Sequence, residues 1–140
     1  MEGFRSGLEE KIADQLRSAG IEPAFEVVKI PFTKPEKVHH YTADFLLPNG
    51  IVVESKGRFV VADRQKHIFV KGQHPKLDLR FVFSNPNARI SKTSPTTYAM
   101  WCQKNGFLYA AKLVPQAWLA EPYCSVRATA ALAFVKAPRK

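Results

Sequence analysis

Two acidic residues and a lysine lie close together in the sequence: Asp44, Glu54 and Lys56. Glu54 and Lys56 are two residues apart in a β-rich segment, so their side chains point to the same face of a strand. Two carboxylates beside an amine could hold a divalent cation and orient a water molecule for attack on a phosphate. The simpler interpretation of Glu-Ser-Lys is an ordinary ion pair on a solvated sheet face.

The turn before Glu54 decides whether Asp44 joins this pair. Residues 41–47 and 51–56 are predicted strands, separated by Pro48-Asn49-Gly50. A three-residue turn, with Gly50 in its left-handed position, pairs position 44 with position 54. A two-residue turn would instead place Asp44 on the face of Ser55. We expect the three-residue turn, which brings together two carboxylates that repel each other unless a cation lies between them. Oxygen ligands on a sheet suit Mg²⁺ or Mn²⁺.

The elements that position these residues begin with a helix over residues 7–19. Ser6 and Glu9 have the spacing of a capping box, which gives Glu9 a purely structural explanation. A strand over residues 24–32 follows, and then a polar, proline-marked linker at residues 33–38. This linker is either a surface loop or an arm that crosses to another subunit.

The rest of the chain alternates between helical and strand patterns, which indicates a mixed α/β domain. The expected elements are a helix capped by Asp63 and ending near Gln73, a strand over residues 77–83, a helix capped by Ser94 and ending at Asn105, a short helix after Pro115, and a basic tail over residues 123–140. We therefore expect one domain over residues 1–122, followed by a basic C-terminal extension.

Composition favours a polyanionic partner. The chain of 140 residues has 21 Lys and Arg against 12 Asp and Glu, a net charge of +9. Such an excess favours nucleic acid, because neutralised phosphates release counterions. The apolar runs are too short to span a bilayer and the N-terminus lacks the apolar core of a signal peptide, so we expect a cytoplasmic protein without a membrane partner.

One predicted helix carries basic residues at helical spacing. Arg64, His67 and Lys71 would share one face, with Lys66 nearby, and this face could hold phosphates without reading bases. A solvated helix face is the alternative. Lys92 is a weaker candidate for the same role. His39 and His40 are adjacent strand residues that point to opposite faces, so we reject them as joint metal ligands.

Several longer strings carry a resemblance to a known family. They are Phe4-Arg-Ser-Gly-Leu-Glu9, Tyr41-Thr-Ala-Asp-Phe-Leu-Leu-Pro-Asn-Gly50, Asp63-Arg64 with His67, Gln73-His74-Pro75 and Ser94-Pro95-Thr96. In order and spacing, from about Phe4 to Pro122, the sequence resembles the endonuclease I family of T-seven-like podophages, which resolves four-way DNA junctions. Asp44 with Glu54-Ser-Lys56 looks like the signature of restriction-endonuclease-like nucleases. Ala43 stands where that signature has proline.

The resemblance implies a structure-selective DNA endonuclease with a restriction-endonuclease-like mixed sheet flanked by helices. It implies metal binding by Asp44, Glu54 and Glu9, a catalytic Lys56, two Mg²⁺ or Mn²⁺ ions per active site, and 5′-phosphate products. At the start of the next strand the family has a further acidic residue where this sequence has Ala24-Phe25, and Glu26 is the nearest acid.

The resemblance also implies a homodimer that acts on branched DNA in the cytoplasm of a bacterial host. Residues 1–32 would be exchanged between the subunits across the linker at 33–38. The DNA-contacting candidates are then Arg5, Arg64, Lys66, His67, Lys71 and Lys92. Two alternatives stay open: a nuclease of the same fold that acts on ordinary duplex or single-stranded DNA, and a non-catalytic basic DNA-binding module.

Overall fold

The computed structural model of the chain describes residues 7–34 and 37–136. Its helices are α1 (Gly7–Ser18), α2 (Val61–Gln73), α3 (Tyr98–Asn105), α4 (Gln116–Leu119) and α5 (Ser125–Leu132). Its strands are β1 (Ala24–Lys34), β2 (Lys37–Leu46), β3 (Val52–Lys56), β4 (Leu79–Phe83) and β5 (Tyr109–Ala111). No helix formed by these residues is long and apolar enough to cross a membrane.

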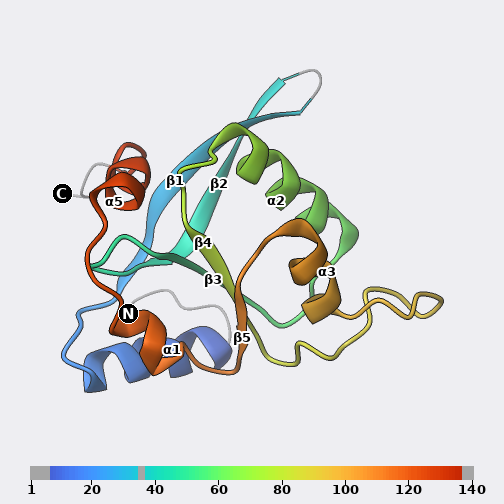
Figure 1. The fold of residues 1–140 in the computed structure, drawn as a ribbon, viewed down its shortest axis with the longest axis horizontal. Coiled ribbons are helices and arrows are strands. Elements are labelled where there is room, and N and C mark those ends of the chain that lie inside the picture. Colours follow the sequence, from blue (N-terminus) through green and yellow to red (C-terminus); the bar gives the residue numbers. More distant parts are fainter. Residues whose placement is uncertain (1–6, 35–36, 137–140) are drawn as a thin grey trace.

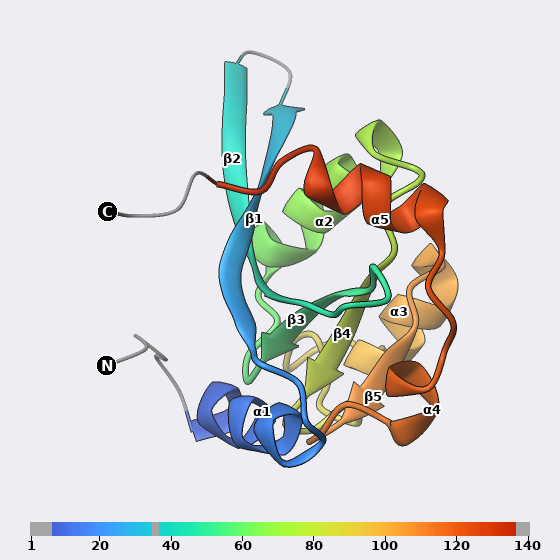
Figure 2. The same cartoon turned by 90° about the vertical axis from the view of Figure 1, so that its left-hand side faces the viewer.

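The strands form one mixed sheet in the order β1-β2-β3-β4-β5 (Figure 1). β1, β2 and β3 are antiparallel neighbours, whereas β3, β4 and β5 are parallel because helices α2 and α3 connect them as crossovers. The predicted mixed α/β fold with flanking helices is confirmed. The short strand β5 was not predicted, because three residues are too few to show alternation. Figure 2 shows that β1 and β2 extend beyond the other strands as a two-stranded arm.

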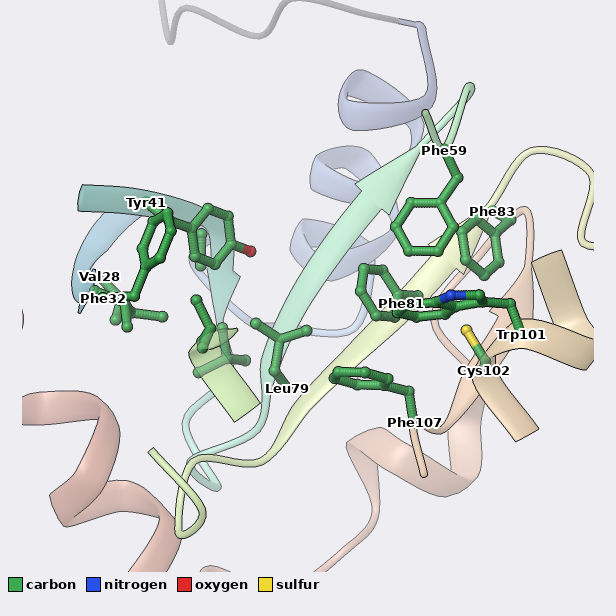
Figure 3. Close-up of a cluster of buried hydrophobic side chains, with 14 of the residues drawn as sticks. Val28, Phe32, Tyr41, Phe59, Leu79, Phe81, Phe83, Trp101, Cys102 and Phe107 are labelled. Atoms are coloured by element: carbon green, nitrogen blue, oxygen red, sulfur yellow. The ribbon is translucent and has the colours of Figure 1, made fainter. Parts of the chain in front are cut away.

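Two apolar clusters hold helices against the sheet. Along β4, Phe81 and Phe83 enter one cluster and Val82 enters the other, as the alternation of side chains in a strand requires. The first cluster packs α2 and α3 against the sheet and contains the aromatic group around Phe59 that Figure 3 shows. The second cluster holds α1 through Ile12 and other residues of that helix. The sheet is thus fixed between helices, which gives the strands that carry Asp44 and Glu54 a rigid support.

The turn between β2 and β3 has the predicted three-residue form. The amide of Leu47 donates to the carbonyl of Ile51 over 2.8 Å, and Phe45 pairs with Val53. Gly50 has a φ of +98°, which favours glycine. A Cβ atom at Gly50 would also lie 2.9 Å from the backbone nitrogen of Ala128. This register continues to place Asp44 opposite Glu54.

Two predicted helix caps are wrong. α2 begins after Val60, which provides no side-chain cap, and Asp63 lies in the first turn instead. α3 begins after Thr97, whose hydroxyl accepts a hydrogen bond from the amide of Met100 over 3.1 Å. The hydroxyl of Ser94 accepts from the amide of Thr96, so it stabilises a local turn before the helix rather than the helix itself.

The basic tail expected at residues 123–140 is instead folded from 125 to 136. In α5, Ala128 and Ala131 are buried, and Arg127 donates to the carbonyl of Asn49 over 2.9 Å. After α5 the chain runs along β1, where the amide of Lys136 donates to the carbonyl of Val27. An alanine-rich composition suits a solvated segment as well as a packed helix, and only the contacts of Ala128, Ala131 and Arg127 with the rest of the domain distinguish the two. Residues 137–140 lie outside the described part.

Candidate active site

Asp44 and Glu54 lie side by side on β2 and β3, and both are buried, with relative exposures of 7% and 4%. One oxygen of Asp44 accepts from the amide and the hydroxyl of Ser55, over 2.9 and 2.8 Å. The Oε1 atom of Glu54 accepts from the hydroxyl of Tyr41 and from the amide of Asp44. Each carboxylate is therefore held by its neighbour's strand, and both are fixed in direction.

The environment of this pair disfavours two negative charges. Burial, followed by the charge of Asp44, raises the pKa of Glu54 from 4.5 to about 7, although Lys56 and Tyr41 oppose the shift. Burial likewise raises the pKa of Asp44, against the hydrogen bonds from Ser55. Both carboxylates would be stabilised in their charged form by a cation at this place.

Lys56 lies between two acids at the end of β3. Its Nζ atom is 3.2 Å from Oε2 of Glu54 and 3.5 Å from Oδ1 of Asp63. Burial lowers the pKa of Lys56, but the charges of Glu54 and Asp63 outweigh it and the pKa is raised. Asp63 also lies 3.6 Å from the Nζ atom of Lys66. The sequence motif predicted Lys56 but not its second partner, because Asp63 comes from the next helix.

An open cavity of about 350 Å³ contains this group. The residues that line it are Glu9, Glu26, His40, Tyr41, Thr42, Asp44, Glu54, Ser55, Lys56 and Lys66. Glu9 is 8% exposed, and its charge contributes to the raised pKa of Asp44. The structure therefore brings all four predicted catalytic residues (Glu9, Asp44, Glu54 and Lys56) to one cavity. Ser6, the expected capping partner of Glu9, lies outside the described residues.

Tyr41 is a site residue that the analysis of spacing missed. Its ring belongs to the apolar cluster of Figure 3, whereas its hydroxyl donates to Glu54. The ammonium of Lys66 lies 4.8 Å from the centre of the Tyr41 ring. Burial, followed by the charge of Glu54, raises the pKa of the Tyr41 hydroxyl, so it remains a donor. A tyrosine in a strand is commonly a buried core residue. Only the position of Glu54 in three dimensions could have shown that the Tyr41 hydroxyl donates to that carboxylate.

Glu26 reaches the cavity through a β-bulge. β1 pairs regularly at Phe25 with Phe45 and again at Val28 with Ala43, so two residues of β1 lie opposite Asp44 alone. Glu26 has a φ of +52°, a conformation that is uncommon for a residue other than glycine. Sequence analysis recorded Glu26 only as the nearest acid to a family position. The bulge explains how this acid comes to line the cavity, which strand parity alone does not predict.

The few oxygen ligands at this place suit a hard divalent cation. Asp44 and Glu54 provide carboxylate oxygens on adjacent strands, and burial raises the pKa of both, which a bound cation would counter. Within residues 7–34 and 37–136, no three His, Cys, Asp or Glu side chains are grouped closely enough to hold a metal ion by themselves. Mg²⁺ fits such a site, because it commonly takes one or two carboxylates and keeps several waters.

The sequence matches proteins of known function over most of its length. The family model described as phage endonuclease I matches residues 1–136. The chain belongs to the phage endonuclease I family. It is 51% identical to "Endodeoxyribonuclease 1" of Enterobacteria phage T3 over 119 residues, which cover 85% of this chain and 78% of that protein. It is 50% identical to "Endonuclease I" of Escherichia phage T7 over 119 residues, or 85% and 80% of the two chains. The resemblance noted in the sequence is thus confirmed.

The predicted DNA-contacting face of α2 is divided: Lys71 is exposed and Arg64 is half-buried, whereas His67 lies in the core. His67 is completely buried, between the rings of Tyr41, Phe81 and other aromatic residues, and its role as a DNA contact is wrong. Burial, followed by the charge of Lys66, lowers its pKa. In the part of the chain that the structure describes, neither ring nitrogen has a hydrogen-bond partner. Helical spacing alone did not separate His67 from the more exposed Arg64 and Lys71, since histidine fits both a solvated and a buried environment.

Three of the other basic candidates lie on α2, and Lys92 lies outside it. Arg64 donates to the carbonyl of Phe59, and Lys71 donates to the carbonyl of Gly106 over 3.1 Å. Lys66 alone of the α2 candidates lines the cavity, and Lys92 is exposed in the segment between β4 and α3. Arg5 lies outside the described residues. DNA contacts by Arg64, Lys66, Lys71 and Lys92 remain predictions.

Proposed function

We propose that this protein is a divalent-metal-dependent endonuclease that cuts four-way DNA junctions by phosphodiester hydrolysis. The observation that carries the proposal is the buried pair of Asp44 and Glu54 with Lys56 beside it, in a chain of the phage endonuclease I family. A structural ion pair does not need two adjacent carboxylates that both have raised pKa values. The names of the relatives in phages T3 and T7 support DNA as the substrate.

Asp44 and Glu54 would hold the metal, with Glu9 completing or orienting the site. We expect Mg²⁺ or Mn²⁺, two ions in each active site. Such ions, when bound, supply Lewis-acid stabilisation of the charge that develops on the phosphate. Tyr41 and Ser55 hold the two carboxylates in direction through their hydrogen bonds. The chain thus presents ligand oxygens that are already oriented.

Lys56 would act on the substrate side of the carboxylates. Its ammonium can orient the attacking water or stabilise the negative charge on the phosphoryl oxygens in the transition state. With Glu54 occupied by a cation, Asp63 would remain as the partner that keeps Lys56 in place. Selection of a branched substrate would depend on shape and on the placement of phosphates by basic residues, in line with the net charge of +9.

The active protein would be a homodimer that exchanges its N-terminal parts. Symmetric cutting of a four-way junction needs two sites related by a two-fold axis. Glu9 lies on α1, before the segment that joins β1 to β2, whereas Asp44 on β2 and Glu54 and Lys56 on β3 come after that segment. In an exchanged dimer the same contacts would form between chains. A heterodimer with Glu9→Ala in one chain and Glu54→Ala in the other tests this, because exchange leaves one wild-type site and restores single-strand nicking. Verified heterodimers without nicking would exclude the exchange.

The test of the activity is a cleavage comparison. A four-way junction and its separate linear arms are incubated with the protein, with Mg²⁺ and with EDTA. We expect Mg²⁺-dependent cuts near the branch point and much slower cutting of the linear arms. Equal cutting of junction and arms would indicate a nuclease of ordinary DNA. Binding without any cutting would indicate the non-catalytic module instead.

A further inference from the structure

His40 lines the active-site cavity but has no place in the chemistry derived so far. It is exposed, on the part of β2 that leads into Asp44. Its neighbour His39 turns the other way and stacks on Phe32, with ring centres 5.5 Å apart. The two adjacent histidines therefore have different environments, as strand alternation requires. Only the second of them can meet a molecule that enters the cavity.

A DNA phosphate that enters this acidic cavity needs a hydrogen-bond donor that is not already paired with another side chain. Four of its lining residues are acids (Glu9, Glu26, Asp44 and Glu54), and these would repel the phosphates of a DNA strand. The ammonium of Lys56 is shared between Glu54 and Asp63, and that of Lys66 lies against Asp63 and Tyr41. Of the nitrogen-bearing side chains that line the cavity, only His40 makes no hydrogen bond or ion pair within the described residues.

We propose that His40 binds the DNA strand that is cut, by donating a ring N–H to a non-bridging oxygen of a phosphodiester above the carboxylates. This rests on the proposed endonuclease function and adds a residue that positions the substrate. Neutral imidazole keeps one N–H donor and the protonated ring has two, so the contact does not depend on the charge of the ring. His40 pairs with Pro31 of β1, and this pairing fixes the backbone from which the His40 side chain extends.

The first test measures binding to a labelled four-way junction without metal, and single-turnover cleavage with Mg²⁺. Loss of a hydrogen bond to a charged group predicts that His40→Ala weakens binding by about tenfold. His40→Gln keeps a donor and should recover part of the loss. His39→Gln is the matched control and should stay within about twofold of wild type. The proposal is overturned if His40→Ala binds and cleaves the junction within twofold of wild type. It is also overturned if His39→Gln loses as much affinity as His40→Ala, because equal losses would indicate that both substitutions disturb strand β2.

A second test locates the contact on the DNA. Junctions carry one methylphosphonate in place of a phosphodiester, at the cut position or at a neighbouring one, and binding is again measured without metal. At the contacted phosphate, the methylphosphonate should weaken binding by wild type as much as the His40→Ala substitution weakens binding to unmodified DNA. The same methylphosphonate should not weaken binding by His40→Ala any further. If the losses of affinity from the methylphosphonate and from His40→Ala are additive at every position tested, His40 contacts none of these phosphates and the proposal is overturned. A wild-type protein that cuts no DNA with Mg²⁺ would refute the proposed function, whereas cutting with an unaffected His40→Ala refutes only this inference.

Discussion

Two groups of charged side chains lie on opposite faces of the parallel strands β3 and β4, because Glu54 alternates with Val53 and Arg80 alternates with Phe81. At the start of β4, Arg80 and Arg127 meet Asp78 and Glu121 in a network of ion pairs 2.5–3.1 Å long. At the end of β3, Asp44 and Glu54 share essentially one ammonium, that of Lys56. The first group balances its charges and the second does not.

The pKa values of the two groups move in opposite directions. Hydrogen bonds from Arg80, joined by those from Arg127, lower the pKa of Glu121 from 4.5 to about 2. Burial and the charge of Asp44 raise the pKa of Glu54 to about 7. A network satisfied within the chain serves to fasten α4 and α5 to the sheet. A group that lacks positive charge is the better candidate for binding a cation, and this difference supports the proposal that the second group is the active site.

The largest effect should come from Glu54→Gln, which removes one of the two buried carboxylates. We expect cleavage of a four-way junction to fall by roughly a thousandfold or more, since a charge-stabilising group is lost from the reaction. Affinity should stay within a few-fold, because phosphate contacts elsewhere supply most of it. Single-turnover cleavage and metal-free binding measure the two quantities.

Glu121→Gln is the matched control for Glu54→Gln, since it makes the same change in the balanced group. It should leave the cleavage rate of folded protein within about twofold, because Glu121 does not line the cavity that contains Asp44 and Glu54. Substantial cleavage by Glu54→Gln in saturating Mg²⁺ would remove Glu54 from the active site.

The next effect concerns stability and the balanced group. Arg80→Met removes a guanidinium that is 4% exposed and leaves Asp78 and Glu121 with Arg127 alone. Asp78 and Glu121 are partly exposed, so the loss in the free energy of unfolding should lie at the lower end of that for a buried ion pair broken from one side, at about 3 kcal/mol. Urea denaturation measures this loss, and cleavage per folded molecule should be unchanged. If Arg80→Met is as stable as wild type but cleaves poorly, the group around Arg80 is functional rather than structural, contrary to the proposal.

The pH dependence of stability separates the two groups without a change of activity. In metal-free protein, folded Glu54 keeps its proton up to about pH 7, whereas the unfolded chain releases it near 4.5. Stability should therefore fall as the pH rises through this range, by up to about 3 kcal/mol. Glu121 acts oppositely: its contribution is present above pH 4.5 and is lost as the pH falls towards 2.

Urea denaturation of wild type and Glu54→Gln at a series of pH values checks the sign of the Glu54 effect. The fall between pH 4.5 and 7 should be largely absent from Glu54→Gln, and Mg²⁺ should reduce it in wild type. An unchanged fall in the variant would assign it to other groups.

Local sequence signals predicted the strands of the site better than the surroundings of its residues. The turn at Gly50 could be predicted because a left-handed position restricts the residue type, and that turn fixed the register of Asp44 against Glu54. The helix α1 followed from its apolar period. These are constraints between residues close in the chain, which a single sequence records directly.

Contacts between distant elements were the ones that could not be predicted. His67 has the spacing of a basic helix face, yet that side of α2 packs on the aromatic cluster. Tyr41 and Glu26 reach the site through the curvature and the bulge of the arm, neither of which has a local sequence pattern. Asp63 was expected as a helix cap and lies instead beside Lys56. A side chain with two compatible environments is assigned only by the packing of the whole chain.

The smallest predicted effect concerns this last residue. Asp63→Asn removes one of the two acids beside Lys56 and leaves the pair with Glu54 at 3.2 Å. If Asp63 keeps Lys56 in place while Glu54 is engaged with a cation, the single-turnover rate at saturating DNA should fall by about tenfold, a loss of roughly 1.4 kcal/mol in transition-state stabilisation. Affinity for the junction should hardly change.

The control is Asp14→Asn, which removes the acid of an exposed ion pair with Arg17 on α1, where the Asp14 side chain is 77% exposed. That variant should cleave as wild type does, because exposed pairs contribute little. Melting temperatures are compared for both variants, so that a slower rate in Asp63→Asn can be separated from loss of fold. A wild-type rate for Asp63→Asn would mean that Glu54 alone positions Lys56, and the unbalanced group would then consist of Asp44, Glu54 and Lys56 without any support from α2.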